Sequence, residues 1–207
     1  YNRRVHVVLS WDPNDESLAR TDNQYIYINA GNKMVTDISG RENRYQIVCG
    51  LFAHELGHVL YTDFLAGQTY MNNLASFRWY PEPPELLKSI DAKNEKDLWE
   101  YIKQDEKNLQ AVTYVSHQIT NVIEDGYIEG RMLNNFPGTL GYGLEKLRDA
   151  HFTKLPTVTK MKENEECGLA HIFESILTCI LSYAKFGEIK YGEESLSDER
   201  IQTVFSL

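Results

Sequence analysis

Hydrophobic and polar residues alternate near the start of the chain. Residues 4–11 (RVHVVLSW) are rich in valine and are followed by the turn-forming DPND, which predicts a β-strand. Residues 23–31 (NQYIYINAG) alternate and contain the β-favouring Tyr and Ile, which predicts a second strand. From about residue 42 to residue 62, apolar residues recur at spacings of three and four, as on one face of a helix. The chain therefore begins with two strands and a long helix.

Helical patterns dominate the remainder of the chain. Residues 70–80 fit neither period, 81–90 (PEPPELLKSI) is expected to be a stiff connector that enters a helix at Pro84, and 134–143 (NNFPGTLGYG) is expected to be a break. Further helices are expected at 94–108, 109–133, 144–152, 165–187 and 197–206. Two early strands followed by helices predict an α+β fold that is mostly helical.

The helix expected at 42–62 contains the sequence FAHELGHVLYTDF, in which His54, Glu55 and His58 interrupt an apolar run. Positions i and i+4 lie on the same face of a helix, so the two imidazoles can bind one ion. Two neutral imidazoles are half of a zinc site. Glu55 is rotated by about 100° from His54, so it lies beside the metal and can accept a proton from a metal-bound water. This His-Glu-x-x-His arrangement is typical of zinc metallopeptidases.

The apolar surroundings of the motif give a second reason to expect a metal. Two histidines and a glutamate without partners in a buried helix would cost several kcal/mol. A bound cation removes that cost. Two imidazoles suit Zn²⁺ best, although another divalent ion is an alternative.

A catalytic zinc needs three protein ligands and one open position. The third ligand is expected from residues 120–132 (TNVIEDGYIEGRM), which combine an apolar stripe with an acidic one. If Asp125 is the ligand, Glu129 lies one turn further and can accept a hydrogen bond from a ligand histidine. If Glu124 is the ligand, Asp125 can take that outer role. The i,i+4 spacing of Asp125 and Glu129 favours Asp125 as the ligand. Alternatively, Glu124 and Asp125 have no functional role and belong to a solvated acidic face of the helix.

Three other histidines are conceivable ligands, namely His117, His151 and His171. A site that recruits one of them would have four protein ligands and would be structural rather than catalytic. His171, in the apolar stretch CGLAHIFESIL, is expected to be a core residue. Alternatively it could stabilise a tetrahedral oxyanion, as could one of the tyrosines.

The two stretches FAHELGHVLYTDF and NVIEDGYIEGRM together resemble the zincin-type metallopeptidases. More narrowly, they are similar to the metallopeptidase-like region of bacterial proteins related to cobalt-chelatase large subunits, which often also carry a von Willebrand A domain. In that group a His-Glu-x-x-His helix is followed by an Asn-x-x-Glu-Asp-x-x-Ile-Glu helix. The matching positions here are His54, Glu55 and His58, then Asn121, Glu124, Asp125, Ile128 and Glu129.

The resemblance implies a Zn²⁺ cofactor, with Glu129 and Asn121 around the ligands. It also implies a small sheet whose edge strand, here YIYINA, lies over the cleft, where an extended peptide could add as a further strand. The chain departs from the group in one respect, because no von Willebrand A domain is visible in it.

The net charge and the cysteine content bear on which partners the protein binds and in which compartment it lies. The net charge of −9 and the pI of about 5.2 argue against nucleic acid or an anionic membrane as a partner. Three cysteines without a Cys-x-x-Cys pair favour a reducing, cytoplasmic compartment. No signal peptide is visible, and the apolar runs are too short for a membrane span. The chain ends inside a helix-like pattern, so we expect a piece of a longer protein.

We therefore expect residues 1–207 to form a single zincin-like domain. Strands and the motif helix would occupy residues 1–65, and a helical part at 66–207 would supply the third ligand. The leading hypothesis is a zinc-dependent peptidase that acts on a peptide or protein substrate, with Glu55 as the general base. The alternative is a non-catalytic metal-binding or peptide-binding module that cooperates with an ATPase or von Willebrand A partner. A proteolytic toxin or effector is a third hypothesis.

Overall fold

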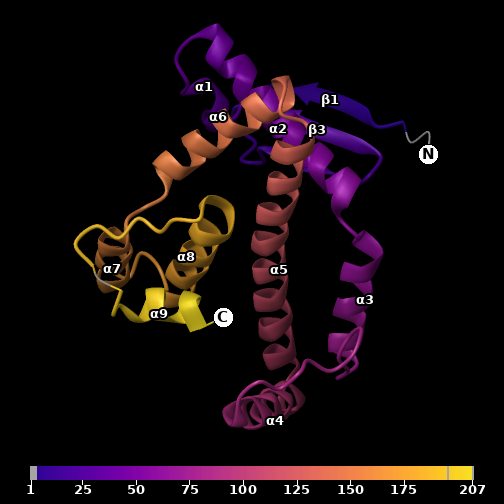
Figure 1. Cartoon of the computed structure of the whole chain (residues 1–207), viewed down its shortest axis with the longest axis vertical. Coiled ribbons are helices and arrows are strands. Elements are labelled where there is room, and N and C mark those ends of the chain that lie inside the picture. Colours follow the sequence, from indigo (N-terminus) through magenta and orange to yellow (C-terminus); the bar gives the residue numbers. More distant parts are fainter. Residues whose placement is uncertain (1–3, 195, 207) are drawn as a thin grey trace. The chain divides into compact units, whose positions relative to one another are not determined.

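The computed structural model describes residues 4–194 and 196–206, which form two compact units. The sheet unit comprises the described residues up to Thr62 and those from Val122 onward. The helical unit is Asp63–Asn121. The long helix α5 (Glu106–Asn135) contributes its first half to the helical unit and its second half to the sheet unit (Figure 1). The boundary expected after residue 65 differs from this division, because the described residues from 122 onward belong to the same unit as the strands.

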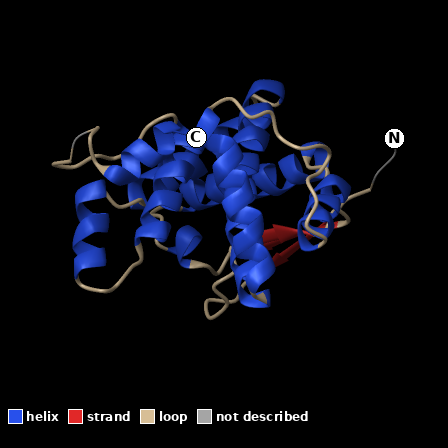
Figure 2. Cartoon of the chain, turned by 90° about the horizontal axis from the view of Figure 1, so that it is seen from below, coloured by secondary structure: helices blue, strands red, loops and turns tan. Residues whose placement is uncertain are grey.

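The sheet has three strands, β1 (His6–Ser10), β2 (Ala19–Thr21) and β3 (Tyr25–Asn29), in the order β1-β3-β2. β1 pairs with β3 in parallel and β2 pairs with it antiparallel (Figure 2 shows the strands in red). The expectation that YIYINA is an edge strand is wrong, because β3 has a neighbour on both sides. The edge strand β2 was not predicted, since three residues are too short to show a period.

One buried side chain, Asn29 at the end of β3, fixes the loop between β1 and β2. Its Oδ1 accepts a hydrogen bond from the amide of Asp12 at 3.0 Å, and its Nδ2 donates to the carbonyls of Asp12 at 2.7 Å and Asp15 at 3.1 Å. Asn29 is 4% exposed, so these bonds form away from bulk water. The loop that delivers β2 is thereby tied to the centre of the sheet.

The sheet packs against the motif helix α2 (Arg41–Tyr61), which is also in contact with α1 (Lys33–Thr36) and α6 (Thr139–Lys154). α2 and α6 make the most extensive helix contact in the sheet unit. They meet at Gly50 and Gly143, where a Cβ on either residue would collide with the backbone of the other helix. The core around them consists of Ile26, Ile28, Val35, Ile47, Leu51, Ala53, Val59, Met132, Leu144 and Leu147.

The expectation of a break over residues 134–143 is wrong, because most of this segment is helical. α5 continues to Asn135 and α6 begins at Thr139, so the connection is only residues 136–138. The glycines at 141 and 143 that suggested a loop lie inside α6 and are buried. Gly143 serves close packing against α2 there, which local sequence patterns do not reveal.

Three helices at the end of the chain form a second core within the sheet unit. They are α7 (Val158–Glu166), α8 (Ile172–Phe186) and α9 (Glu199–Ser206). The single helix expected at 165–187 is thus two helices, separated by a turn in which Gly168 has a positive φ of 68°. The buried residues of this core are Val122, Val158, Met161, Cys179, Ile180, Ile189, Ile201 and Val204.

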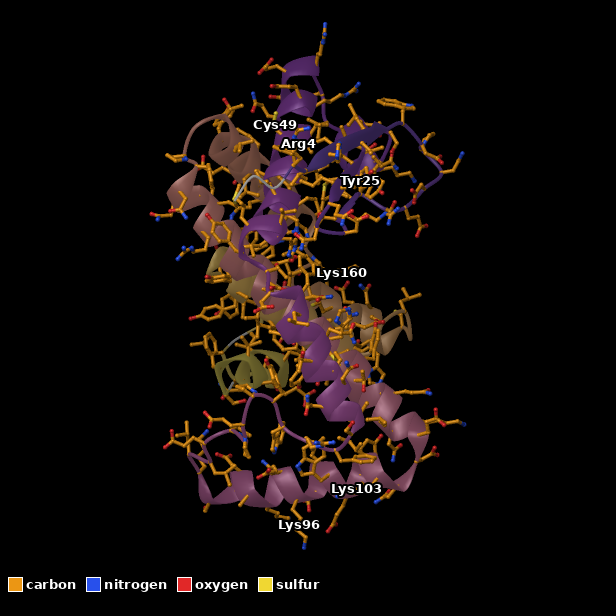
Figure 3. All side chains as sticks on the ribbon, turned by 90° about the vertical axis from the view of Figure 1, so that its right-hand side faces the viewer. Arg4, Tyr25, Cys49, Lys96, Lys103 and Lys160 are labelled. Carbon is orange, nitrogen blue, oxygen red and sulfur yellow. The ribbon has the colours of Figure 1, made fainter. Side chains whose placement is uncertain are left out.

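The helical unit contains α3 (Phe64–Ala75), α4 (Ser89–Gln104) and the first half of α5. Leu74 and Ile102 are its buried apolar residues, at 2% and 1% exposure. Helix α4 begins at Ser89 rather than at Pro84, so residues 81–88 remain a connector throughout. Lys96 and Lys103 lie on α4 (Figure 3), and both are exposed, with the ammonium group of Lys103 over the ring of Phe77.

The described residues therefore form a mostly helical structure with one small mixed sheet, which confirms the α+β class. Within that part of the chain, no helix combines the length and the apolar character that crossing a membrane requires. The features that bear on chemistry all lie in the sheet unit, where α2, the second half of α5, α6 and α8 meet.

Candidate metal centre

Helix α2 presents His54 and His58 one turn apart. Their ring centroids are 5.0 Å apart with an interplanar angle of 81°. Thr62 caps the end of α2. Its Oγ1 lies 2.9 Å from Nδ1 of His58, so Nδ1–H can donate a hydrogen bond to the hydroxyl. In this tautomer the lone pair of Nε2 is free for a cation, whereas in the other tautomer Nε2–H donates to Asp125.

Asp125 on α5 meets the two imidazoles. Its Oδ1 lies 3.3 Å from Nε2 of His58 and 3.7 Å from Nε2 of His54. Among the described residues, these three side chains form the group of His, Cys, Asp or Glu whose ligand atoms could hold a metal ion, all within 4.8 Å of one another. Two predicted ligands and the favoured third one are therefore brought together.

Glu129, one turn beyond Asp125 on α5, lies behind His54. Its Oε1 is 2.9 Å from His54 Nδ1, and the residue is only 1% exposed. A carboxylate that accepts this hydrogen bond fixes the orientation of the ring and directs Nε2 toward the metal position. This is the outer role that the spacing of the two acids predicts.

Two basic residues that sequence reasoning missed complete the surroundings of Glu129. The Nη1 of Arg148, on α6, donates to Oε2 of Glu129 at 2.7 Å, and Nζ of Lys185, on α8, lies 2.8 Å from Oε1. Lys185 also lies 3.4 Å from Oδ2 of Asp125. The one signal in the sequence is that Lys185 follows an apolar helical run, ILTCILSYA, where a buried lysine needs an acidic partner.

Close packing between α5 and α8 brings Lys185 to the acids. A Cβ at Gly126 would lie 2.6 Å from the carbonyl oxygen of Ala184, so only glycine lets the two helices approach this closely. Gly126 follows Asp125 and Ala184 precedes Lys185. The crossing point of the helices therefore sets the contact between the acid and the lysine.

The charges around the two acids keep both ionised. Burial disfavours the charged form of Asp125, but the hydrogen bond from His58 and the charges of His54 and Lys185 outweigh burial and lower its pKa to about 2. Burial likewise opposes ionisation of Glu129, but its bond to His54 and the charge of Lys185 lower its pKa to about 2. Both carboxylates are available to a cation at neutral pH.

Asp125 and Glu129 also change the pKa of His54. Burial lowers the pKa of His54, but the hydrogen bond to Glu129 and the charge of Asp125 outweigh it, so the pKa is raised. In the absence of a cation, His54 therefore tends to carry a proton that helps to neutralise Asp125 and Glu129. A metal ion at the same place would take over that charge.

Glu55 lies on the same helix but is not part of the ligand group. It is 6% exposed, and burial raises its pKa, with the histidines opposing and Asp125 adding to the shift. A carboxylate with a raised pKa is a stronger base than a solvated one. Glu55 therefore has the environment that a general base needs.

A cavity of about 230 Å³ opens beside these residues. Glu55, His54, Asp125 and His151 line it on the polar side. The imidazole of His151 packs edge-on against Phe186, and no hydrogen bond of its side chain to another described residue is formed. Its pKa is lowered by burial and by the charge of Lys185, so the ring is neutral and can donate one hydrogen bond into the cavity.

The remaining predicted residues lie elsewhere. Glu124 is half-buried but is not in the ligand group, and the amide of Asn121 lies 3.3 Å from His117 rather than against a ligand histidine. The expectation that His171 is a core residue is wrong. It is exposed and caps the start of α8, where its Nδ1 accepts a hydrogen bond from the amide of Phe173.

The donor set fits Zn²⁺. A tetrahedral ion with bonds of about 2.0–2.1 Å separates its ligand atoms by about 3.3–3.4 Å, which matches the spacing from Asp125 to His58 and is near that to His54. Two imidazoles and one carboxylate also leave a fourth position open. No protein-family model, curated protein or solved structure matches this chain.

Proposed function

We propose that this chain is a zinc-dependent peptidase of the zincin type. One observation carries the proposal: the Nε2 atoms of His54 and His58 and Oδ1 of Asp125 converge beside a buried glutamate that lines an open cavity. Three protein ligands with a free fourth position distinguish a catalytic zinc site from a structural one. In the described part of the chain no fourth His, Cys, Asp or Glu joins the group, which favours the enzyme over a purely structural metal site.

A bound Zn²⁺ would supply a Lewis acid that polarises the substrate carbonyl and lowers the pKa of water. Glu55 accepts a proton from the attacking water on a carboxylate oxygen. It then delivers a proton to the nitrogen of the leaving amine. Its buried position supports this role, because a pKa above the ordinary value brings the group closer to neutral pH.

We assign a supporting role to His151, in place of the earlier expectation for His171. The ring of His151 lines the same cavity as Glu55 and makes no side-chain hydrogen bond within the described residues. A neutral imidazole there can donate to the carbonyl oxygen as negative charge develops on it. A tyrosine in this role has no support, since none of the described tyrosines lines the cavity.

The strand that borders the cavity is β2, in place of YIYINA. The amide of Asn29 donates to the carbonyl of Leu18 at 2.9 Å. Because such bonds alternate along an antiparallel pair, the polar groups of Ala19 face the free edge of the sheet. Ala19 itself lines the cavity, so an extended peptide that pairs with this edge would run past Glu55.

The walls of the cavity indicate the kind of residue that binds next to the cleaved bond. Leu18, Met34, Leu51 and Leu147 line it on the apolar side. Arg148 and Lys185 also border it, but both are already paired with Glu129. The proposed substrate therefore places an uncharged, apolar side chain in this cavity.

The deciding experiment compares wild type with Glu55→Gln on a mixture of peptides read by mass spectrometry. We expect Glu55→Gln to retain zinc and to lose hydrolysis by a factor of about 100 or more. Glu42→Gln is the matched control, because Glu42 is exposed on the same helix. Full turnover by Glu55→Gln would exclude this mechanism. A wild-type protein that binds zinc and peptide without cleavage would instead support the non-catalytic module and its ATPase or von Willebrand A partner.

A further inference from the structure

Lys185 is a buried cation that contacts both acids of the centre. Its side chain is 6% exposed, and Nζ lies 2.8 Å from Oε1 of Glu129 and 3.4 Å from Oδ2 of Asp125. These two acids lie one turn apart on α5, whereas the lysine comes from α8. The lysine therefore bridges the acid that would bind the metal and the acid that orients His54.

The two oxygens of Asp125 face different partners. Oδ1 faces the Nε2 atoms of His54 and His58, and Oδ2 faces the ammonium group of Lys185. Glu129 is divided in the same way, since Oε1 binds His54 and Lys185 while Oε2 binds Arg148. A metal ion and Lys185 would consequently share one carboxylate and lie on opposite sides of it.

Charged groups in a buried site interact strongly, because little water separates them. A buried acid without a partner is costly, so Lys185 stabilises Asp125 and Glu129 when no metal is present. The same positive charge repels a divalent cation a few ångströms away, and water does not screen that repulsion well in a buried site. The charge of Lys185 therefore stabilises the metal-free protein but weakens the binding of the metal.

We propose that Lys185 is a built-in counter-cation of the metal centre. It holds the acid pair in position before the metal binds and lowers the affinity of the site for the metal. This inference rests on the proposed metal centre. Lys185 is thus a positioning residue that also lowers the affinity for the metal. A residue that only orients a metal ligand behaves differently, because its removal weakens metal binding.

The test measures Zn²⁺ affinity by competition with a chromophoric chelator at about pH 8, above the ordinary histidine pKa of about 6.5. Lys185→Met removes the charge and is expected to bind Zn²⁺ roughly tenfold more tightly than wild type, while its metal-free form unfolds at a lower temperature. Lys185→Arg keeps the charge and is expected to stay near wild type in affinity. Lys190→Met is the control, because Lys190 is a half-buried lysine whose Nζ binds the carbonyl of Leu155 instead of the acids.

A second variant covers the case in which Lys185→Met folds poorly. Lys185→Gln removes the charge but keeps a donor for Glu129, and it is also expected to bind Zn²⁺ more tightly. Equal or weaker binding by the folded neutral variant, beside a normal Lys185→Arg, would overturn the inference and leave the metal centre intact. Failure of the wild-type protein to bind any divalent ion would overturn both.

Discussion

The Nδ1 atom of His54 lies 2.9 Å from Oε1 of Glu129, a carboxylate that is almost completely shielded from solvent. With only 1% of its surface exposed, Glu129 has little contact with water that could replace this hydrogen bond. The orientation of His54 therefore depends on Glu129, and through it on Arg148 and Lys185.

Glu129→Gln should weaken Zn²⁺ binding by about 10- to 100-fold. The amide keeps the size of the side chain but lacks the charge that holds His54 and balances Arg148. Chelator competition measures the change. Glu145→Gln, an exposed position on α6, is the matched control and should leave the affinity unchanged. An affinity equal to wild type in Glu129→Gln would show that His54 is oriented by something else.

The choice between the two neighbouring acids can be decided by a pair of variants. Asp125→Asn should abolish measurable Zn²⁺ binding, because an amide oxygen is a much weaker ligand than a carboxylate and the charge is lost. Glu124→Gln should bind as wild type, since Glu124 is not among the converging groups. Metal analysis after dialysis reads both variants. The reverse pattern would make Glu124 the ligand.

The metal-free protein should lose stability in acid. Asp125 and Glu129 have pKa values of about 2, below their ordinary values of 3.8 and 4.5. Their contribution to the free energy of unfolding is therefore complete above about pH 4.5 and is lost as the pH falls toward 2. Urea unfolding in the presence of a chelator, followed by circular dichroism, would measure it. A free energy that stays constant below pH 4.5 would contradict the assignment.

The same experiment should also show a loss of stability on the alkaline side. The pKa of His54 is raised above its ordinary value of 6.5. Its contribution is present below about pH 6.5 and is lost as the pH rises through the raised pKa. The metal-free protein should therefore be most stable between about pH 5 and 6. His54→Gln should remove the alkaline slope and also weaken the acid one, because His54 helps to lower the pKa values of Asp125 and Glu129.

The close approach of α5 and α8 predicts a contrast between two glycines. Gly126→Ala should destabilise the protein by about 1–3 kcal/mol, because the added Cβ would lie 2.6 Å from the carbonyl oxygen of Ala184. Gly130→Ala, one turn further on α5, meets no atom within 4 Å and should stabilise the helix by up to about 1 kcal/mol. Thermal unfolding of both variants measures the difference. Equal effects would mean that the helices can separate at Gly126 without cost.

Sequence alone could predict the parts of the centre that depend on one helix. The i,i+4 spacing of His54 and His58, and that of Asp125 and Glu129, places each pair on one helical face whatever else the chain does. The limits of α2 were predicted to within one residue, because its apolar period is long. Local geometry was sufficient for these features.

Features that depend on contacts between distant segments were not predictable in the same way. Lys185 and Arg148 belong to helices whose sequences do not reveal that both meet Glu129. Gly143 suggested a loop because its use, close packing against Gly50, lies in another helix. The central position of β3 depends on β2, which is too short to leave a pattern.

The helical unit, Asp63–Asn121, separates the two motifs along the chain yet forms its own compact body. We therefore expect its length to vary among relatives without a change in the spacing within either motif. The intervals within each motif have no such freedom, because one inserted residue would turn the following side chain by about 100° around the helix. Distant relatives should therefore be sought by two rigid signatures, H-E-x-x-H and D-x-x-x-E, joined by a spacer of any size.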